Sequence, residues 1–199
     1  MSITTYAELK TSVSNWIKRA DLTSYLDDIV TLGESRIMRE VRTSDMETAL
    51  SGSISSGTMA LPTGYLELKF AYVSAAPVTW LQKKSASWIY QKYPIRSGGE
   101  VPKFIAREGT NFIFGPYPSN ATIAGVYYKN LGPLSSNLHN LFVNNPDLYL
   151  FACLAETEPF IKNDPRIQIW EAKYEKIKND INGLRDREDA GSDLQITAA

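Results

Sequence analysis

The stretch that decides the fold is YLELKFAY, residues 65–72, in which apolar and charged side chains alternate. Its even-numbered residues, from Leu66 to Tyr72, are all apolar and fall on one face of an extended chain, whereas Glu67 and Lys69 fall on the other. The alternation predicts a β-strand in a sheet that is covered on one side only.

Similar short runs surround this strand. They are separated by turn-forming clusters, such as SSG at 55–57 and PTG at 62–64. Ser85 is placed to cap a short helix over residues 86–92, and Glu108-Gly109 suits a tight hairpin turn. The other strand candidates are residues 50–54, 58–61, 78–82, 103–107, 111–114 and 121–129.

Both ends of the chain have a helical period instead. Thr5 and Glu8 form a T-x-x-E capping box ahead of a first helix, and a second is expected over residues 22–42. Gly33 inside that helix is about 1 kcal/mol less favourable than Ala, which either a close approach by another helix or tolerated surface variation would explain. Asn145-Pro146 is a helix start signal, and a final amphipathic stripe ends at Leu184.

These patterns predict an α+β fold in which the N- and C-terminal helices pack as a helical bundle with a β-rich antiparallel insertion between them. The expected boundaries are 1–43 and 146–184 for the bundle and 44–145 for the insertion. Residues 185–199 form a polar C-terminal tail that is too poor in apolar residues to fold alone.

Composition excludes several classes of protein. The single Cys153 cannot form an internal disulfide, and no apolar run reaches the roughly 20 residues that a membrane span needs. No secretion signal is visible at the N-terminus, so the expected location is intracellular. Net charge is −1, with eight basic and five acidic residues in 44–145 against seven and eleven in 146–199. This uneven charge is either ordinary solvated surface or the sign of two different partners, and it lacks the basic stripe of a nucleic-acid binder.

The sequence predicts no catalytic site. His139 is the only histidine, and although Ser135, Ser136 and Asp147 are near it in sequence, no nucleophile elbow accompanies them. A zinc site would need more His or Cys ligands, and no phosphate-binding or dinucleotide motif occurs. We therefore expect no enzyme activity, no metal and no cofactor.

Aromatic residues are concentrated in the β-rich region. They are typical of sheet core or of a subunit interface, and less often of a surface that stacks on sugars. Tyr127 and Tyr128 are adjacent and must face opposite sides of a strand, so we expect at least one of them to meet another element or another chain. Both are candidates for a subunit interface. The aromatic set is Trp80, Trp88, Tyr90, Tyr93, Phe104, Phe112, Phe114, Tyr117, Tyr127 and Tyr128.

Packing and turn motifs recur along nearly the whole chain. They are TYAELK with Trp16, LGESRIMRE at 32–40, ALPTGYLE at 60–67, PKF at 102–104, NFIFGPYP at 111–118, the Tyr127-Tyr128 pair, NPD at 145–147 and Ile169-Trp170 with Tyr174. Taken together and in this order, they resemble the adaptor, or head-to-tail connector, proteins of tailed bacteriophages and prophages. None of these motifs is chemical, and the tail after Leu184 departs from the family pattern.

The resemblance implies a structural role in the virion neck, after synthesis in the host cytoplasm. Such adaptors sit under the capsid portal, typically as a ring of twelve subunits. The implied partners are the portal, neighbouring adaptor subunits and the next tail or stopper component, while DNA passes through the channel without sequence-specific binding and no membrane is involved. We expect the tail to dock on the portal through Arg185, Arg187, Leu194 and Ile196. The alternative is a β-rich tail or baseplate module that contacts glycans through Trp80 or Trp88.

Overall fold

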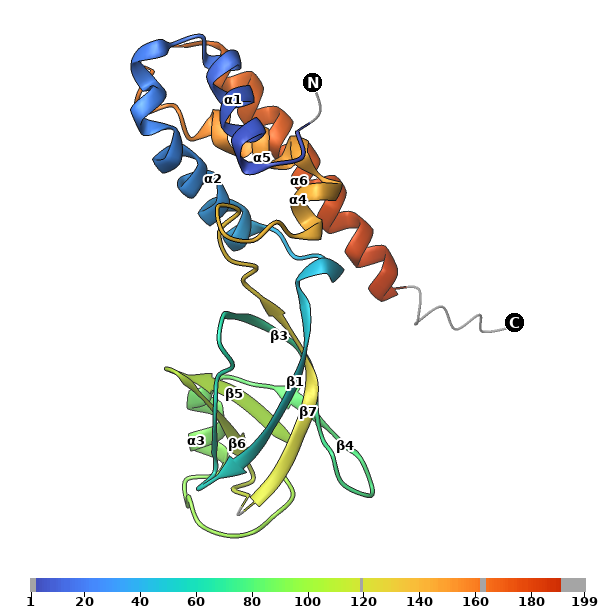
Figure 1. Cartoon of the computed structure of the whole chain (residues 1–199). Coiled ribbons are helices and arrows are strands. Elements are labelled where there is room, and N and C mark those ends of the chain that lie inside the picture. The colour runs from blue at the N-terminus through green and yellow to red at the C-terminus, as the bar shows by residue number, and fades with distance from the viewer. Residues whose placement is uncertain (1–2, 119, 162–163, 191–199) are drawn as a thin grey trace, which may run out of the picture. The chain divides into compact units, whose positions relative to one another are not determined.

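The computed structural model describes residues 3–118, 120–161 and 164–190 (Figure 1). The chain divides into two compact units. Residues 1–46 and 131–199 form one, here called the helical unit, and residues 47–130 form the other, called the barrel unit. The segment 131–145, which follows the last strand and contains a short helix, lies in the helical unit.

The helical unit draws its elements from both ends of the chain. They are α1 (Tyr6–Ile17), the 3-10 helix η1 (Ala20–Tyr25), α2 (Leu26–Glu40), the 3-10 turn η2 (Ser44–Met46), α4 (Asn140–Asn144), α5 (Pro146–Ala155) and α6 (Arg166–Ala190). The predicted capping box is present, because the Thr5 hydroxyl accepts from the Glu8 N–H and the Glu8 carboxylate accepts from the Thr5 N–H. The second helix begins later than expected, after the η1 turn.

Helix α5 forms the centre of the helical unit, because it packs against α1, α2 and α6. Seven of its ten residues are buried, as expected for a helix that is apolar on nearly every side. Of the two explanations open for Gly33, the structure shows the close approach of another helix: a Cβ there would lie 3.0 Å from the backbone nitrogen of Cys153 on α5. Burial raises the pKa of the Cys153 thiol, so this cysteine is an inert packing group.

The barrel unit contains all the strands found in the described residues. They are β1 (Glu47–Ser55), β2 (Thr58–Ala60), β3 (Tyr65–Val73), β4 (Thr79–Lys83), β5 (Phe104–Glu108), β6 (Asn111–Gly115) and β7 (Asn120–Lys129), with helix α3 (Ala86–Lys92) between β4 and β5. The strand order around the wall is β1-β2-β6-β5-β4-β3-β7, and β7 closes the barrel by pairing with β1 over nine residue pairs.

The predicted fold, a helical bundle with an antiparallel β-rich insertion, is wrong. The strands close into a seven-stranded barrel with a core of its own, and β4 and β5 pair in parallel. Alternation along a strand shows which face is buried but not whether the outer strands meet, so the sequence pattern left closure undetermined. Closure pairs β1 with β7, the two strands that end this order, so neither is left as an open sheet edge.

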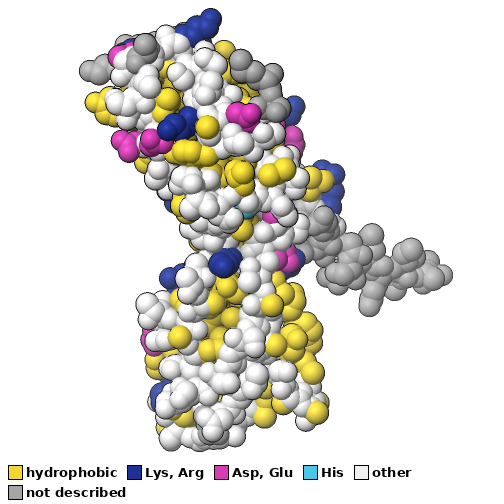
Figure 2. Space-filling model, in the orientation of Figure 1, with side chains coloured by type: hydrophobic (Ala, Val, Ile, Leu, Met, Phe, Trp, Pro, Cys, Tyr) yellow, Lys and Arg dark blue, Asp and Glu magenta, His cyan; other side chains and the backbone are white. Residues whose placement is uncertain are grey.

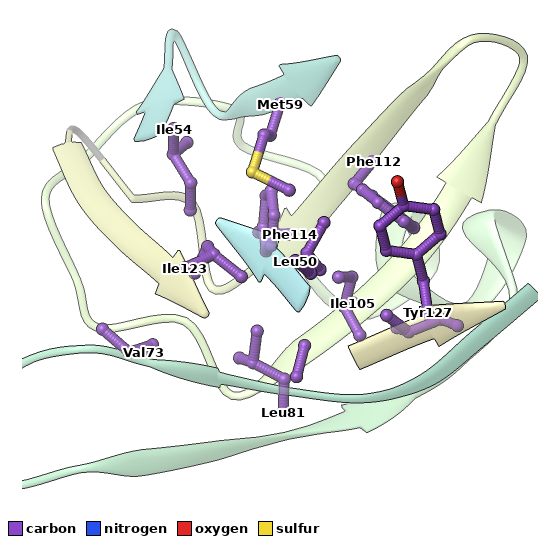
Figure 3. Packing of buried hydrophobic residues seen from close by; sticks show 12 residues of the cluster. Leu50, Ile54, Met59, Val73, Leu81, Ile105, Phe112, Phe114, Ile123 and Tyr127 are labelled. Atoms are coloured by element: carbon purple, nitrogen blue, oxygen red, sulfur yellow. The ribbon is translucent and has the colours of Figure 1, made fainter. Parts of the chain in front are cut away.

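Side chains from all seven strands fill the barrel interior (Figure 3). Figure 3 shows Leu50, Ile123 and Phe114 converging there with Leu81 and Ile105. The buried cluster comprises Leu50, Ile54, Met59, Leu68, Ala71, Val73, Leu81, Ile105, Phe112, Phe114, Ile123 and Tyr127. Each large side chain buried in this way contributes roughly 1.5–3 kcal/mol relative to its exposure, so the barrel has its own hydrophobic stabilisation.

Strand β3 departs from the predicted alternation. Its pairing with β7 shifts register between Tyr65 and Glu67, and again between Leu68 and Phe70. A bulge changes the side on which the next residue points, so Leu68 faces the core whereas Phe70 and Tyr72 face outward. The prediction of one apolar face from Leu66 to Tyr72 is therefore wrong, and two large aromatic side chains lie on the outside of the barrel.

Helix α6 continues beyond Leu184, the end of the predicted stripe, to Ala190. The residues that follow, 191–199, lie outside the described part of the chain. No helix within the described ranges is long and apolar enough to cross a membrane.

Candidate interaction surfaces

An exposed aromatic patch lies on the outer face of β3 and β4. The Trp80 ring centroid is 5.5 Å from that of Phe70 and 5.4 Å from that of Tyr72. Trp80 is 62% exposed, the neighbouring Val78 is 56% exposed, and both Phe70 and Tyr72 are half-buried. We call Phe70, Tyr72, Val78 and Trp80 the aromatic patch; Figure 2 shows hydrophobic side chains gathered on the β4 side of the barrel unit.

Strand pairing explains why the patch faces outward. Trp80 pairs across the ladder with Tyr72, while its neighbour Leu81 points into the core. Soluble monomers rarely expose a cluster of large apolar side chains, and exposed Trp and Tyr are typical anchors of protein interfaces. The aromatic patch is therefore the strongest candidate for an interaction surface on the barrel unit.

A second aromatic group holds α3 against the barrel. The Trp88 ring lies 4.8 Å from the Phe104 ring, centroid to centroid, and 6.4 Å from the Tyr93 ring. Trp88 and Phe104 pack against a small buried cluster that includes Ile89 and Ile113. Trp88 therefore supports the fold, whereas the ring of Trp80 is left largely in solvent.

The predicted interface tyrosines lie in buried positions. Tyr127 belongs to the barrel core, where its ring stacks at 5.9 Å on that of Tyr65, and Tyr128 is 3% exposed. The role expected for them between subunits stays a prediction. The aromatics that the structure does expose, Trp80 above all, come from the same sequence region.

The residues predicted to dock on the portal are only partly described. Arg185 and Arg187 lie near the C-terminal end of α6, and Arg185 donates to the Asp186 carboxylate at 2.9 Å. Leu194 and Ile196 lie outside the described residues. The assignment of these four residues to portal docking stays a prediction.

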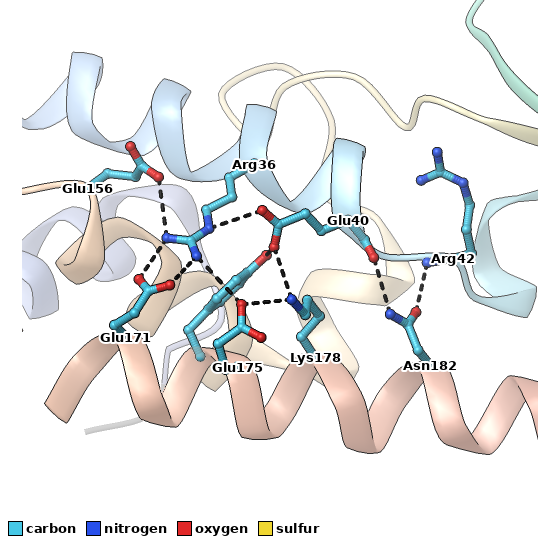
Figure 4. Close-up of polar contacts among 9 residues, drawn as sticks. Arg36, Glu40, Arg42, Glu156, Glu171, Glu175, Lys178 and Asn182 are labelled. Atoms are coloured by element: carbon cyan, nitrogen blue, oxygen red, sulfur yellow. Dashed lines mark hydrogen bonds and ion pairs between the residues drawn. The ribbon is translucent and has the colours of Figure 1, made fainter. Parts of the chain in front are cut away.

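A polar network joins α2 to α6 in the helical unit (Figure 4). The Arg36 guanidinium makes a two-pronged contact with the Glu171 carboxylate, and it lies 3.4–3.7 Å from carboxylate oxygens of Glu40, Glu156 and Glu175. It also stacks 4.3 Å above the centre of the Tyr174 ring. Since the Arg36 side chain is only 14% exposed, one largely buried cation holds four carboxylates in place.

The network continues one turn further along α6. The Tyr174 hydroxyl donates to Glu40 at 3.0 Å, and Lys178 bridges Glu175 and Glu40. Asn182 then donates to the Glu40 carbonyl and accepts from the Arg42 N–H, both at 3.1 Å. The end of α2 is thereby fixed against α6 by side-chain contacts.

The network changes the protonation of its members. The hydrogen bond from Arg36 holds the pKa of Glu171 below its usual value, and the same contact raises the pKa of Arg36. Burial and the nearby Glu40 raise the pKa of Tyr174. All these shifts favour the ion-paired, fully hydrogen-bonded state, which is the behaviour of a structural network.

The only histidine is enclosed in the helical unit. His139 is 8% exposed, its Nε2 lies 3.5 Å from the Tyr149 hydroxyl, and burial lowers its pKa. Ser136, one of the serines named with it, donates instead to the Pro133 carbonyl. In the described residues, this arrangement does not bring a serine hydroxyl to the imidazole.

The two units differ in charge. Residues 47–130 carry eight basic and four acidic side chains, whereas the remainder of the chain carries thirteen basic and eighteen acidic ones. Opposite net charges on two units of one chain allow complementary contacts between copies or with other proteins.

In the described residues, the candidate sites are surfaces: an exposed aromatic patch on a closed barrel, and a helical unit of opposite net charge in the same chain. Comparison with family models gives the family: the SU10 adaptor protein model matches residues 4–197, and the chain belongs to this family of phage adaptors. A search of curated proteins finds no significant match. The protein is thus a bacteriophage adaptor, and the resemblance found in the sequence is confirmed.

Proposed function

We propose that the protein docks as a ring under the capsid portal, extends the DNA channel and provides a platform for tail proteins, without catalysis. The family assignment over residues 4–197 carries this proposal. The partners in this proposal are the portal, neighbouring adaptor subunits in a twelve-fold ring and the next tail or stopper component. DNA passes through the channel without sequence-specific binding, and the protein occupies the virion neck.

A ring requires two interaction surfaces on each subunit. Its contacts run head to tail, so each copy must present two different complementary surfaces. The aromatic patch on the barrel unit supplies an apolar anchor for one of them. The excess of basic side chains in the barrel unit and of acidic ones in the remainder favours contacts between unlike surfaces of neighbouring copies.

Trp80→Ala is expected to weaken assembly without unfolding the barrel. Removal of an exposed interface anchor typically weakens binding by 2 kcal/mol or more, roughly thirtyfold. Within the subunit it removes two ring contacts of about 1 kcal/mol each. The half-saturating concentration for loading on portal rings, measured by sedimentation, should rise at least tenfold.

Trp88→Ala is the matched comparison. Trp88 packs on Phe104 and supports α3, so its loss should lower the melting temperature more than the loss of Trp80 does. Unchanged loading by the Trp80 variant would remove the aromatic patch from the assembly interface.

Deletion of residues 185–199 tests portal docking by the C-terminal segment. We expect attachment to portal rings to be abolished while the monomer stays folded, because the α6 residues that contact α2 precede Leu184. A second deletion, of residues 191–199, keeps Arg185 and Arg187 and shows which half of the segment matters. If the protein that lacks residues 185–199 attaches to portal rings as well as the full chain does, the assignment of this segment to portal docking is wrong.

The exposure of Trp80 favours a second candidate, a tail or baseplate module that binds glycans. An indole that is 62% exposed beside two further rings offers a flat surface for stacking on sugars. A glycan array probed with the protein and with its Trp80→Ala variant tests whether the protein binds glycans through this indole. Binding that disappears in the variant supports this candidate, and an array without signal removes it.

A further inference from the structure

The barrel wall is incomplete where β4 ends. β4 pairs with β3 only over Thr79–Leu81, and with β5 only at Gln82 and Lys83, before the chain enters α3. Both neighbouring strands extend past this end, since β3 begins at Tyr65 and β5 continues from Ile105, the partner of Lys83, to Glu108. Beyond the end of β4, no strand in the described barrel lies between β3 and β5.

A pocket of about 190 Å³ opens at this point. Its floor is made by three members of the barrel core, and its rim is mainly basic. We call it the β3–β5 cleft. The floor residues are Leu68, Ile105 and Phe112; the rim is formed by Lys83, Lys84 and Arg107, together with Glu67 and Tyr65.

The backbone N–H and carbonyl groups of alternate β5 residues point toward the side of the cleft. The Ile105 carbonyl accepts from the Lys84 N–H of the β4 end at 2.9 Å, so the polar groups of Ile105 point toward β4. Strand residues alternate in this direction, so those of Arg107, two residues further on, point the same way. An extended chain laid along this edge would continue the ladder that β4 begins.

The rim contains three basic side chains, those of Lys83, Lys84 and Arg107. Lys84 lies 5.4 Å above the Trp88 ring, and Arg107 lies 5.5 Å above the Tyr65 ring and donates to the Gly109 carbonyl. Within the described residues, none of the three basic rim side chains pairs with a carboxylate. Three cations around an apolar floor, with Glu67 as the one acid, favour an occupant that is apolar on one face and acidic on the other.

We propose that the β3–β5 cleft binds an extended acidic segment of a neighbouring virion protein as an added strand. Alternate side chains of the segment cover Leu68 and Phe112, while carboxylates between them meet the basic rim. The source of the segment rests on the adaptor role proposed above, whereas binding in the cleft is tested on the isolated protein. Loss of portal attachment and loss of peptide binding are therefore separate outcomes.

The probe is a fluorescein-labelled octapeptide of alternating glutamate and valine, followed by fluorescence anisotropy. We expect saturable binding that weakens with added salt and that a peptide with lysine in place of glutamate does not show. The double variant Lys83→Glu/Lys84→Glu should raise the Kd for the glutamate peptide at least tenfold. Lys92→Glu/Lys103→Glu, which changes the barrel charge equally but lies outside the cleft lining, should leave the Kd within twofold.

Hydrogen exchange gives a second readout. It uses the unmodified protein, so a folding defect in a variant cannot account for the result. The Arg107 amide should exchange at least tenfold more slowly when the glutamate peptide is bound, because an added strand accepts its hydrogen bond. The proposal is overturned by absence of saturable binding, by equal weakening in both double variants, or by unchanged exchange at Arg107 under saturating peptide.

Discussion

Gly125→Val is expected to prevent the barrel from closing and to lower its free energy of unfolding by about 3 kcal/mol or more. A Cβ at Gly125 would lie 2.2 Å from the Phe70 carbonyl oxygen and 2.8 Å from the Ala71 Cα. Both are backbone atoms of β3, so no side-chain rotation relieves the overlap. β7 pairs with β1 and β3 at this residue, and separation there opens the wall on one side.

Chemical denaturation followed by tryptophan fluorescence measures the effect, since Trp80 and Trp88 report on the barrel unit. Ala124→Val is the matched control on the same strand, at a half-buried position where a side chain is already accommodated. Its unfolding free energy should stay within about 1 kcal/mol of the parent. If Gly125→Val unfolds at the same denaturant concentration as the parent, the close approach of β7 and β3 is refuted.

Arg36→Met is the second large effect, and we expect it to destabilise the helical unit by about 2–3 kcal/mol at neutral pH. The substitution keeps most of the apolar stem but removes the cation that four glutamates share. The side chains of Glu171 and Glu175 are 41% exposed, so solvent screening makes the expected loss smaller than for a fully buried ion pair. Arg39→Met on the exposed face of α2 should change stability by less than about 0.5 kcal/mol.

The effect of Arg36→Met should depend on pH. Arg36 depresses the pKa of Glu171 in the folded state, so the contact stabilises the fold above the ordinary glutamate pKa of 4.5. As the pH falls through the depressed value, Glu171 becomes protonated in both states and this stabilisation is lost. The difference in unfolding free energy between parent and variant should therefore shrink as the pH falls below 4.5. A difference that stays constant on acidification would show that packing, and not charge, accounts for the loss.

The helix signals could be read from the sequence because they depend on neighbouring residues. The capping box at Thr5 and the α3 bounds set by Ser85 are confirmed, since a cap is formed by residues three apart. The approach to Gly33 was one of two explanations open from the sequence, and only the position of Cys153 decides between them.

The outward turn of the aromatic patch depends on contacts distant in sequence. The alternation in residues 65–72 is regular, yet the register shift between Leu68 and Phe70 arises from pairing with β7 and moves Phe70 to the outer face. Trp80 is one of ten aromatics that the sequence singles out, and its exposure follows from the cross-strand pair with Tyr72. Closure of the barrel depends likewise on the pairing of β1 with β7, some seventy residues apart.

The adaptor role is tested most directly by co-sedimentation with purified portal rings from the same genome, followed by imaging of the complex. We expect a symmetric collar beneath the portal. The images should show how many copies form the collar and that the DNA channel of the portal continues through it. Absence of association, with portal rings that still bind their other partners, would contradict the adaptor role proposed for this protein.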